Sequence, residues 1–98
     1  MEMERSIMTI NEYGSVILPE DISGIWMSEP ELVELFGVIA PTLRAAIRAV
    51  YKSGVLNEYK VQKYIQLNNG CHADVFSFQI IVVLAFRIDS FGAEQVRK

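Results

Sequence analysis

Several classes of protein are excluded by what the sequence lacks. A single cysteine, Cys71, among 98 residues cannot build an internal disulfide framework and suits a reducing compartment. The longest apolar run covers seven residues, 80–86, whereas about 20 are needed to span a bilayer. The first residues are acidic and polar, unlike a secretory signal. We therefore expect a cytoplasmic protein that does not enter a membrane.

The residue patterns of common active sites are also missing. We find no paired carboxylates, no glycine-rich phosphate loop and no catalytic triad. Cys71 and His72 are adjacent, but one cysteine and one histidine cannot complete a tetrahedral zinc site, and neighbours on a strand point to opposite faces. The sequence therefore predicts a protein that is not an enzyme, with no cofactor, no metal site and no small-molecule substrate.

Positive charge is scarce as well. Nine lysines and arginines stand against twelve acidic residues, so the formal net charge is −3. This balance provides no overall attraction to nucleic acid, and DNA binding would need a local group of cations. The apolar share of 51% and the charged share of 21% are typical of a globular chain. Its length predicts one domain over residues 1–98.

The first 24 residues have the composition of short strands. β-branched residues at positions 7, 9 and 10, and again at 16 and 17, flank turn residues around Gly14. We predict a short β-hairpin here, which Pro19 ends.

Two helices with a tight corner between them follow. Ser28 and Glu31 have the spacing of a capping box, and Gly37 can adopt the left-handed conformation that ends a helix. Pro41 suits the first turn of a second helix, which we predict over residues 41–53.

The second helix is predicted to have two distinct faces. At about 100° per residue, its apolar face carries Leu43, Ile47 and Val50. On another side lies a cationic stripe, which consists of Arg44, Arg48 and Lys52. Guanidinium groups can bind phosphate oxygens or the edge of guanine, and a lysine adds a phosphate contact. Charged outer faces are common on amphipathic helices, so solvation alone explains the stripe about equally well.

A second hairpin is predicted after a turn or short connector at residues 55–60. The Asn-Gly pair within residues 68–70 separates β-type runs at 61–67 and 71–76, and such a pair tolerates the positive φ of a tight turn. Tyr59, Lys60, Lys63 and Tyr64 bring cations and aromatic rings to this region, which is equally typical of an edge strand protected by lysine.

A third helix is predicted over residues 78–88, capped by Ser77. It is apolar nearly all round, so we expect it to be the buried centre, with Phe76, Phe78 and Phe86 in the core. Ser90 and Gly92 are expected to interrupt it before a last helical turn within residues 93–98.

Helix, corner, helix, hairpin and helix is the layout of a winged helix-turn-helix. We therefore predict an α+β fold in which residues 25–98 form this unit and residues 1–24 form the N-terminal strands. The helix at 41–53 would enter the major groove of DNA, and the Asn68–Gly70 loop would be the wing.

A family pattern runs along about three quarters of the chain, within residues 25–97 of 98. Its segments are Trp26-Met27-Ser28, Leu35-Phe36-Gly37, Thr42-Leu43 with Ile47, Gly54-Val55-Leu56, Phe76-Ser77-Phe78-Gln79, Ala85-Phe86-Arg87-Ile88-Asp89-Ser90 and Gln95-Val96-Arg97. In this order and spacing they resemble the N-terminal domain of RhuM-like bacterial proteins, described as virulence-associated or DNA-binding. The resemblance implies a winged helix-turn-helix, DNA binding as in a bacterial transcriptional regulator, and no catalytic chemistry.

The resemblance and the cation pattern together predict double-stranded DNA as the partner. The predicted contact residues are Thr42, Arg44, Arg48, Lys52, Lys60 and Lys63. A homodimer is compatible with such a regulator.

The corner between the helices departs from the family pattern. Ile39, Ala40 and Pro41 stand where the family has hydroxyl groups and a cation. This departure and the acidic balance favour an alternative: a protein-interaction or dimerisation module that keeps the winged-helix scaffold and has lost the DNA contacts.

Overall fold

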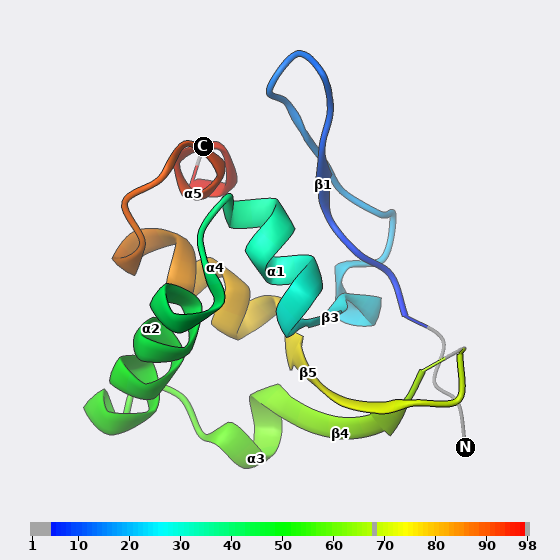
Figure 1. Ribbon diagram of the computed structural model, residues 1–98, viewed down its shortest axis with the longest axis vertical. Coiled ribbons are helices and arrows are strands. Elements are labelled where there is room, and N and C mark those ends of the chain that lie inside the picture. The colour runs from blue at the N-terminus through cyan, green and yellow to red at the C-terminus, as the bar shows by residue number, and fades with distance from the viewer. Residues whose placement is uncertain (1–4, 68, 98) are drawn as a thin grey trace.

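The structure, a computed structural model, describes residues 5–67 and 69–97. Within these residues the chain forms an α+β fold with five α-helices, one short 3-10 helix and two antiparallel sheets (Figure 1). The helices are α1 (Glu29–Phe36), α2 (Ala40–Ser53), α3 (Glu58–Val61), α4 (Phe78–Arg87), α5 (Phe91–Arg97) and the 3-10 helix η1 (Ile22–Gly24). The strands are β1 (Thr9–Ile10), β2 (Val16–Ile17), β3 (Trp26–Ser28), β4 (Gln62–Gln66) and β5 (His72–Ser77).

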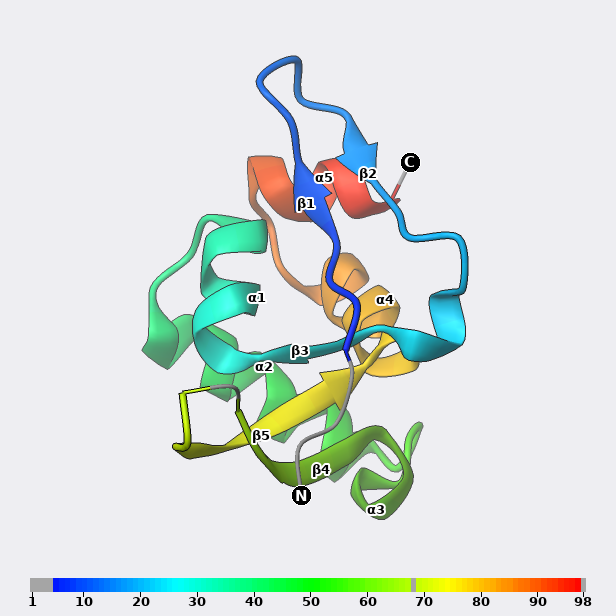
Figure 2. The same ribbon diagram turned by 90° about the vertical axis from the view of Figure 1, so that its right-hand side faces the viewer.

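The predicted N-terminal hairpin is confirmed. β1 and β2 are antiparallel, and Ile10 is opposite Val16. The Asn11 side chain accepts hydrogen bonds from the backbone N–H groups of Tyr13 and Ser15 at 2.9 and 3.0 Å, and Gly14 supplies a φ of +79° that the turn requires. Figures 1 and 2 show that this hairpin projects from the rest of the molecule.

The second sheet has the strand order β3-β5-β4, with β5 at the centre. The β4–β5 hairpin was expected from the sequence, but β4 is one residue shorter than predicted at each end, with Val61 in α3, and β5 is shifted by one residue to end at Ser77. Asn68, part of the predicted loop, lies outside the described residues. β3 was not expected: three residues carry too little alternation to be recognised, and pairing with β5 makes them a strand.

The corner between α1 and α2 is formed as the sequence predicts. The Ser28 N–H donates a hydrogen bond to Glu31 at 2.7 Å, and Gly37 ends α1 with φ +67°. α2 begins at Ala40, one residue before the predicted start, and ends at Ser53. Its apolar face is buried as predicted: Leu43, Ile47 and Val50.

The turn or short connector predicted at residues 55–60 contains a short helix that was not expected. The short helix α3 begins there, because the Asn57 side chain accepts a hydrogen bond from the Tyr59 N–H at 2.9 Å and caps the first turn. Four residues are too few for a helical repeat of apolar positions to show in the sequence.

α4 confirms a helix from Phe78, but two details of the prediction are wrong. Phe86 is 68% exposed, because the face that α4 buries is centred on Ile81 and Leu84. Ser77 occupies the N-cap position, yet its hydroxyl makes no capping hydrogen bond, and among the described residues its Oγ is buried without a partner.

The last helix starts earlier than predicted. α5 begins at Phe91, so Gly92 lies within it and does not interrupt the helix. The Ser90 hydroxyl accepts a hydrogen bond from the Ala93 N–H at 3.1 Å and donates one to the Phe36 carbonyl at 2.7 Å. These bonds cap α5 and attach it to the end of α1. Lys98, the last residue of the predicted turn, lies outside the described residues.

The core lies where α1, α2, α4 and α5 meet the three-stranded sheet. Its largest fully buried side chains are Met8, Ile25, Met27, Leu32, Phe36, Leu43, Val50, Val61, Val75, Ile80, Ile81 and Leu84. This core leaves one long side of α2 in solvent. In residues 5–67 and 69–97, no helix has the length and apolar character of a membrane span.

Candidate nucleic-acid interface

α2 presents a polar face to solvent. Because its apolar side faces the core, the side chains of Thr42, Arg44, Arg48 and Lys52 are exposed. Arg48 and Lys52 form no ion pair with any described residue. Two cations one helical turn apart are therefore available to an anionic partner along this face.

The third cation of the stripe is already paired. Arg44 lies across from Glu29 in the first turn of α1, with its Nη2 2.7 Å from Oε1 and its Nε 3.1 Å from both carboxylate oxygens. The hydrogen bonds and the charge of Glu29 raise the pKa of Arg44. This is a forked contact in which two guanidinium nitrogens meet one carboxylate.

Lys60 and Lys63 lie on different elements, α3 and β4. Lys60 is exposed on α3, which a short loop joins to the C-terminal end of α2 (Figure 1). The Lys63 ammonium lies 4.4 Å from the ring centre of Trp26, a cation–π contact across the sheet. Alternate residues of a strand point to opposite faces, so Lys63 faces away from the side that carries Gln62 and Tyr64.

The sheet face that carries Gln62 adjoins α2. The Tyr51 hydroxyl of α2 donates a hydrogen bond to Gln62 Oε1 at 2.8 Å. Burial, and then the charges of Glu58 and Asp74, raise the pKa of Tyr51 to about 12. The negative charges of these two carboxylates therefore reach the contact between α2 and β4.

The exposed end of the same face carries aromatic side chains. Tyr64 stacks on His72 with ring centres 5.5 Å apart and planes 15° from parallel. The Tyr64 side chain remains 70% exposed, and Tyr59 on α3 is 88% exposed. Two exposed tyrosines therefore lie on the elements that follow α2, one on α3 and one on β4.

The six predicted contact residues do not form one continuous group. Thr42, Arg48 and Lys52 share the exposed face of α2, with Arg44 held by Glu29 at its side and Lys60 on the adjoining α3. Lys63 lies apart from them, against Trp26 on the sheet face opposite to Gln62 and Tyr64. The role of Glu29 was not predicted, because 15 positions separate it from Arg44 and no local pattern in the sequence links the two.

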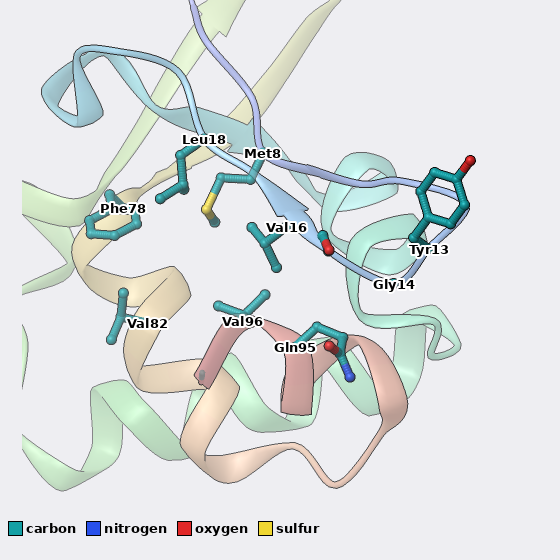
Figure 3. A pocket seen from close by; sticks show the side chains of 10 residues that line it. Met8, Tyr13, Gly14, Val16, Leu18, Phe78, Val82, Gln95 and Val96 are labelled. Atoms are coloured by element: carbon teal, nitrogen blue, oxygen red, sulfur yellow. The ribbon is translucent and has the colours of Figure 1, made fainter.

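A pocket of about 490 Å³ lies at the other end of the molecule, beneath the N-terminal hairpin. In Figure 3, Met8 and Val16 face Val82 of α4 and Val96 of α5 across this space, while Tyr13 points away from it. This pocket was not predicted, because a gap between two elements depends on how they pack against each other.

Comparisons with known proteins identify no relative: no protein-family model, no curated protein and no solved structure matches this chain. The resemblance to RhuM-like proteins accordingly stays a prediction from motifs. In the described ranges, no three histidine, cysteine, aspartate or glutamate side chains come together as a metal site.

Proposed function

We propose that the protein is a DNA-binding transcriptional regulator of the winged helix-turn-helix type. In this proposal α2 enters the major groove, and the β4–β5 hairpin is the wing beside it. The proposal is supported by the chain order β3-α1-α2-β4-β5, in which a two-stranded hairpin follows the second helix of a helix pair, and by the hydrogen bond from Tyr51 of α2 to Gln62 of β4.

The observation that carries the proposal is that Arg48 and Lys52, on the exposed face of α2, form no ion pair within the part of the chain that the structure describes. In a chain of net charge −3, attraction to phosphate must come from such a local group. Ala45, also exposed, leaves room between the cations for the helix backbone to approach a groove.

The test is a fluorescence titration with duplex DNA at several salt concentrations. Each phosphate contact contributes about 0.9 to the slope of log affinity against log salt, so the Arg48→Ala, Lys52→Ala double variant should lose about 2 from that slope. Its affinity should fall at least about tenfold. Lys63→Gln is the control. It removes one positive charge from the sheet face turned away from α2, so it should change the slope less than the double variant does. An affinity that changes neither with salt concentration nor with the two α2 substitutions would contradict the proposal.

A second candidate, self-association without DNA binding, is favoured by the N-terminal hairpin. Ile17 and Leu18 are 51% and 52% exposed, and the hairpin covers the pocket shown in Figure 3. An isolated two-stranded hairpin is at best marginally stable, and a second copy would cover these side chains. Light scattering should then find a dimer that Leu18→Glu converts to monomers. A protein that stays monomeric at all concentrations would contradict self-association.

A further inference from the structure

The N-terminal hairpin lies over α4 and α5 and contacts the rest of the molecule at both of its ends. At its base, the Ser6 N–H donates a hydrogen bond to the Gly24 carbonyl at 2.8 Å, and the Met8 side chain is 2% exposed. At its tip, a Cβ on Gly14 would lie 3.2 Å from the Phe91 ring, so the turn rests on the first residue of α5. The pocket of about 490 Å³ is lined by Met8 and Gly14 and lies between these two contacts, which fix its roof.

The lining of this pocket limits the chemistry of a ligand. Most of it is apolar, and Leu18 and Phe78 lie at one end (Figure 3). Of the described residues that line the pocket, none is an aspartate, glutamate, lysine, arginine or histidine. A charged group placed inside would lose its hydration without gaining a partner, which is strongly unfavourable. The lining therefore disfavours phosphates, carboxylates and amines and suits a neutral molecule.

The other end of the pocket offers a polar group. Gln95 of α5 lies there, away from Leu18 and Phe78, and is half-buried (Figure 3). Its side chain forms no hydrogen bond with another described residue. A side-chain amide both donates and accepts, so it can bind a hydroxyl, carbonyl or amide group of a ligand. Small-molecule sites typically enclose about 300–1,000 Å³ and combine a mostly apolar lining with a few such polar groups.

We propose that this pocket binds a neutral, mostly apolar small molecule, with one polar group of the ligand hydrogen-bonded to Gln95. The ligand would contact the hairpin, α4 and α5 together, so its binding stabilises the hairpin in its present position. This inference does not depend on DNA binding, because the pocket shares no lining residue with α2 or α3.

The test uses two probes of the same ring system that differ in charge, 2-naphthol and naphthalene-2-sulfonate. NMR spectra of protein labelled in its valine methyl groups report where each probe binds. We expect 2-naphthol to shift the signals of the pocket residues Val16, Val82 and Val96 and to leave that of Val55, which is exposed after α2, unchanged. The sulfonate should bind at least about tenfold more weakly, because the pocket offers its charge no partner.

Substitutions locate the probe within the pocket. Val96→Phe puts a phenyl ring into the space and should weaken 2-naphthol binding about tenfold or more without lowering the melting temperature. Val82→Phe fills the same space from α4, in case the first variant disturbs α5. Val55→Phe is the matched control, since this position is 63% exposed and outside the pocket. Gln95→Leu removes the hydrogen bond and should weaken 2-naphthol binding about 3- to 10-fold.

Several results would overturn the inference. Pocket methyl signals that stay unchanged up to the solubility limit of 2-naphthol would show that no such ligand binds. Equal affinity for the two probes, or an affinity for 2-naphthol that neither phenylalanine variant lowers, would show that the probe binds elsewhere. Pocket signals that change with protein concentration without any probe would assign the space to a second copy of the chain. An unchanged affinity in Gln95→Leu would contradict the hydrogen bond to this residue.

Discussion

Glu31 joins three parts of the chain through a single carboxylate. It accepts a hydrogen bond from the Ser28 N–H and forms an ion pair with Arg5 at 2.6 Å, and Arg5 also donates to the Trp26 carbonyl at 2.7 Å. Burial disfavours the charge of Glu31, but the hydrogen bonds from Arg5 and Ser28 and the charge of Arg5 together outweigh it, and the pKa falls below its ordinary 4.5. The cluster ties the N-terminal segment to the start of α1.

We expect Glu31→Gln to lower the free energy of unfolding by about 1 kcal/mol at neutral pH, since a partly exposed ion pair and part of a cap are lost. A lowered pKa in the folded state stabilises the protein above the unfolded pKa, and this stability disappears as pH falls through the folded value. The difference between wild type and variant should therefore shrink below about pH 4.5 in urea unfolding. Glu34→Gln is the control at an exposed position. A difference that stays constant down to acid pH would contradict this account.

At the level of elements, the contact between α5 and α1 depends on Gly92. A Cβ at this position would overlap the Leu35 carbonyl oxygen and come within 2.8 Å of the Phe36 Cα, and both are backbone atoms that cannot move aside alone. Gly92 is buried within α5, so the two helices approach at backbone distance there.

Gly92→Ala should destabilise the protein by about 2–3 kcal/mol, because the added methyl group forces α5 away from α1. For a domain of this size the melting temperature should fall by about 10 °C or more. Gly24→Ala is the matched control, since its Cβ would meet only the Ser6 hydroxyl, at 3.6 Å. Equal melting curves for the two variants would show that the helices do not pack as described.

The elements that the sequence predicted are those with local signals. Ser28, Gly37 and Gly54 mark helix ends, and the apolar repeat of α2 is strong enough to define its buried face. Elements without such signals were missed: β3 exists because β5 pairs with it, and α3 is a single capped turn.

The candidate site was predicted less well than the fold, for the same reason. The exposure of Arg48 and Lys52 follows from the period of α2, and the sequence sufficed for it. The partners of Arg44 and Lys63 depend on how α1 and β3 pack, and both lie far from these cations in the chain. Charge spacing on one helix cannot identify such partners.

At the level of the whole molecule, two surfaces of different chemistry lie apart. Figures 1 and 2 place the N-terminal hairpin at one end of the longest axis and α3 with β4 at the other. The exposed side chains of Ile17 and Leu18 and the pocket belong to the hairpin end, whereas the exposed cations of α2 and α3 lie away from it, with Tyr59 and Tyr64. A DNA contact and a contact between two copies could therefore occur together without competing for the same residues.

The most direct measurement is a titration of isotope-labelled protein with duplex DNA, followed by the NMR shifts of the backbone amides. DNA binding through α2 predicts that the largest shifts occur between Thr42 and Lys52 and continue into α3, while residues 9–17 of the hairpin stay unchanged. Shifts confined to the hairpin, or no shifts at concentrations where nonspecific DNA binding is normally seen, would contradict the account.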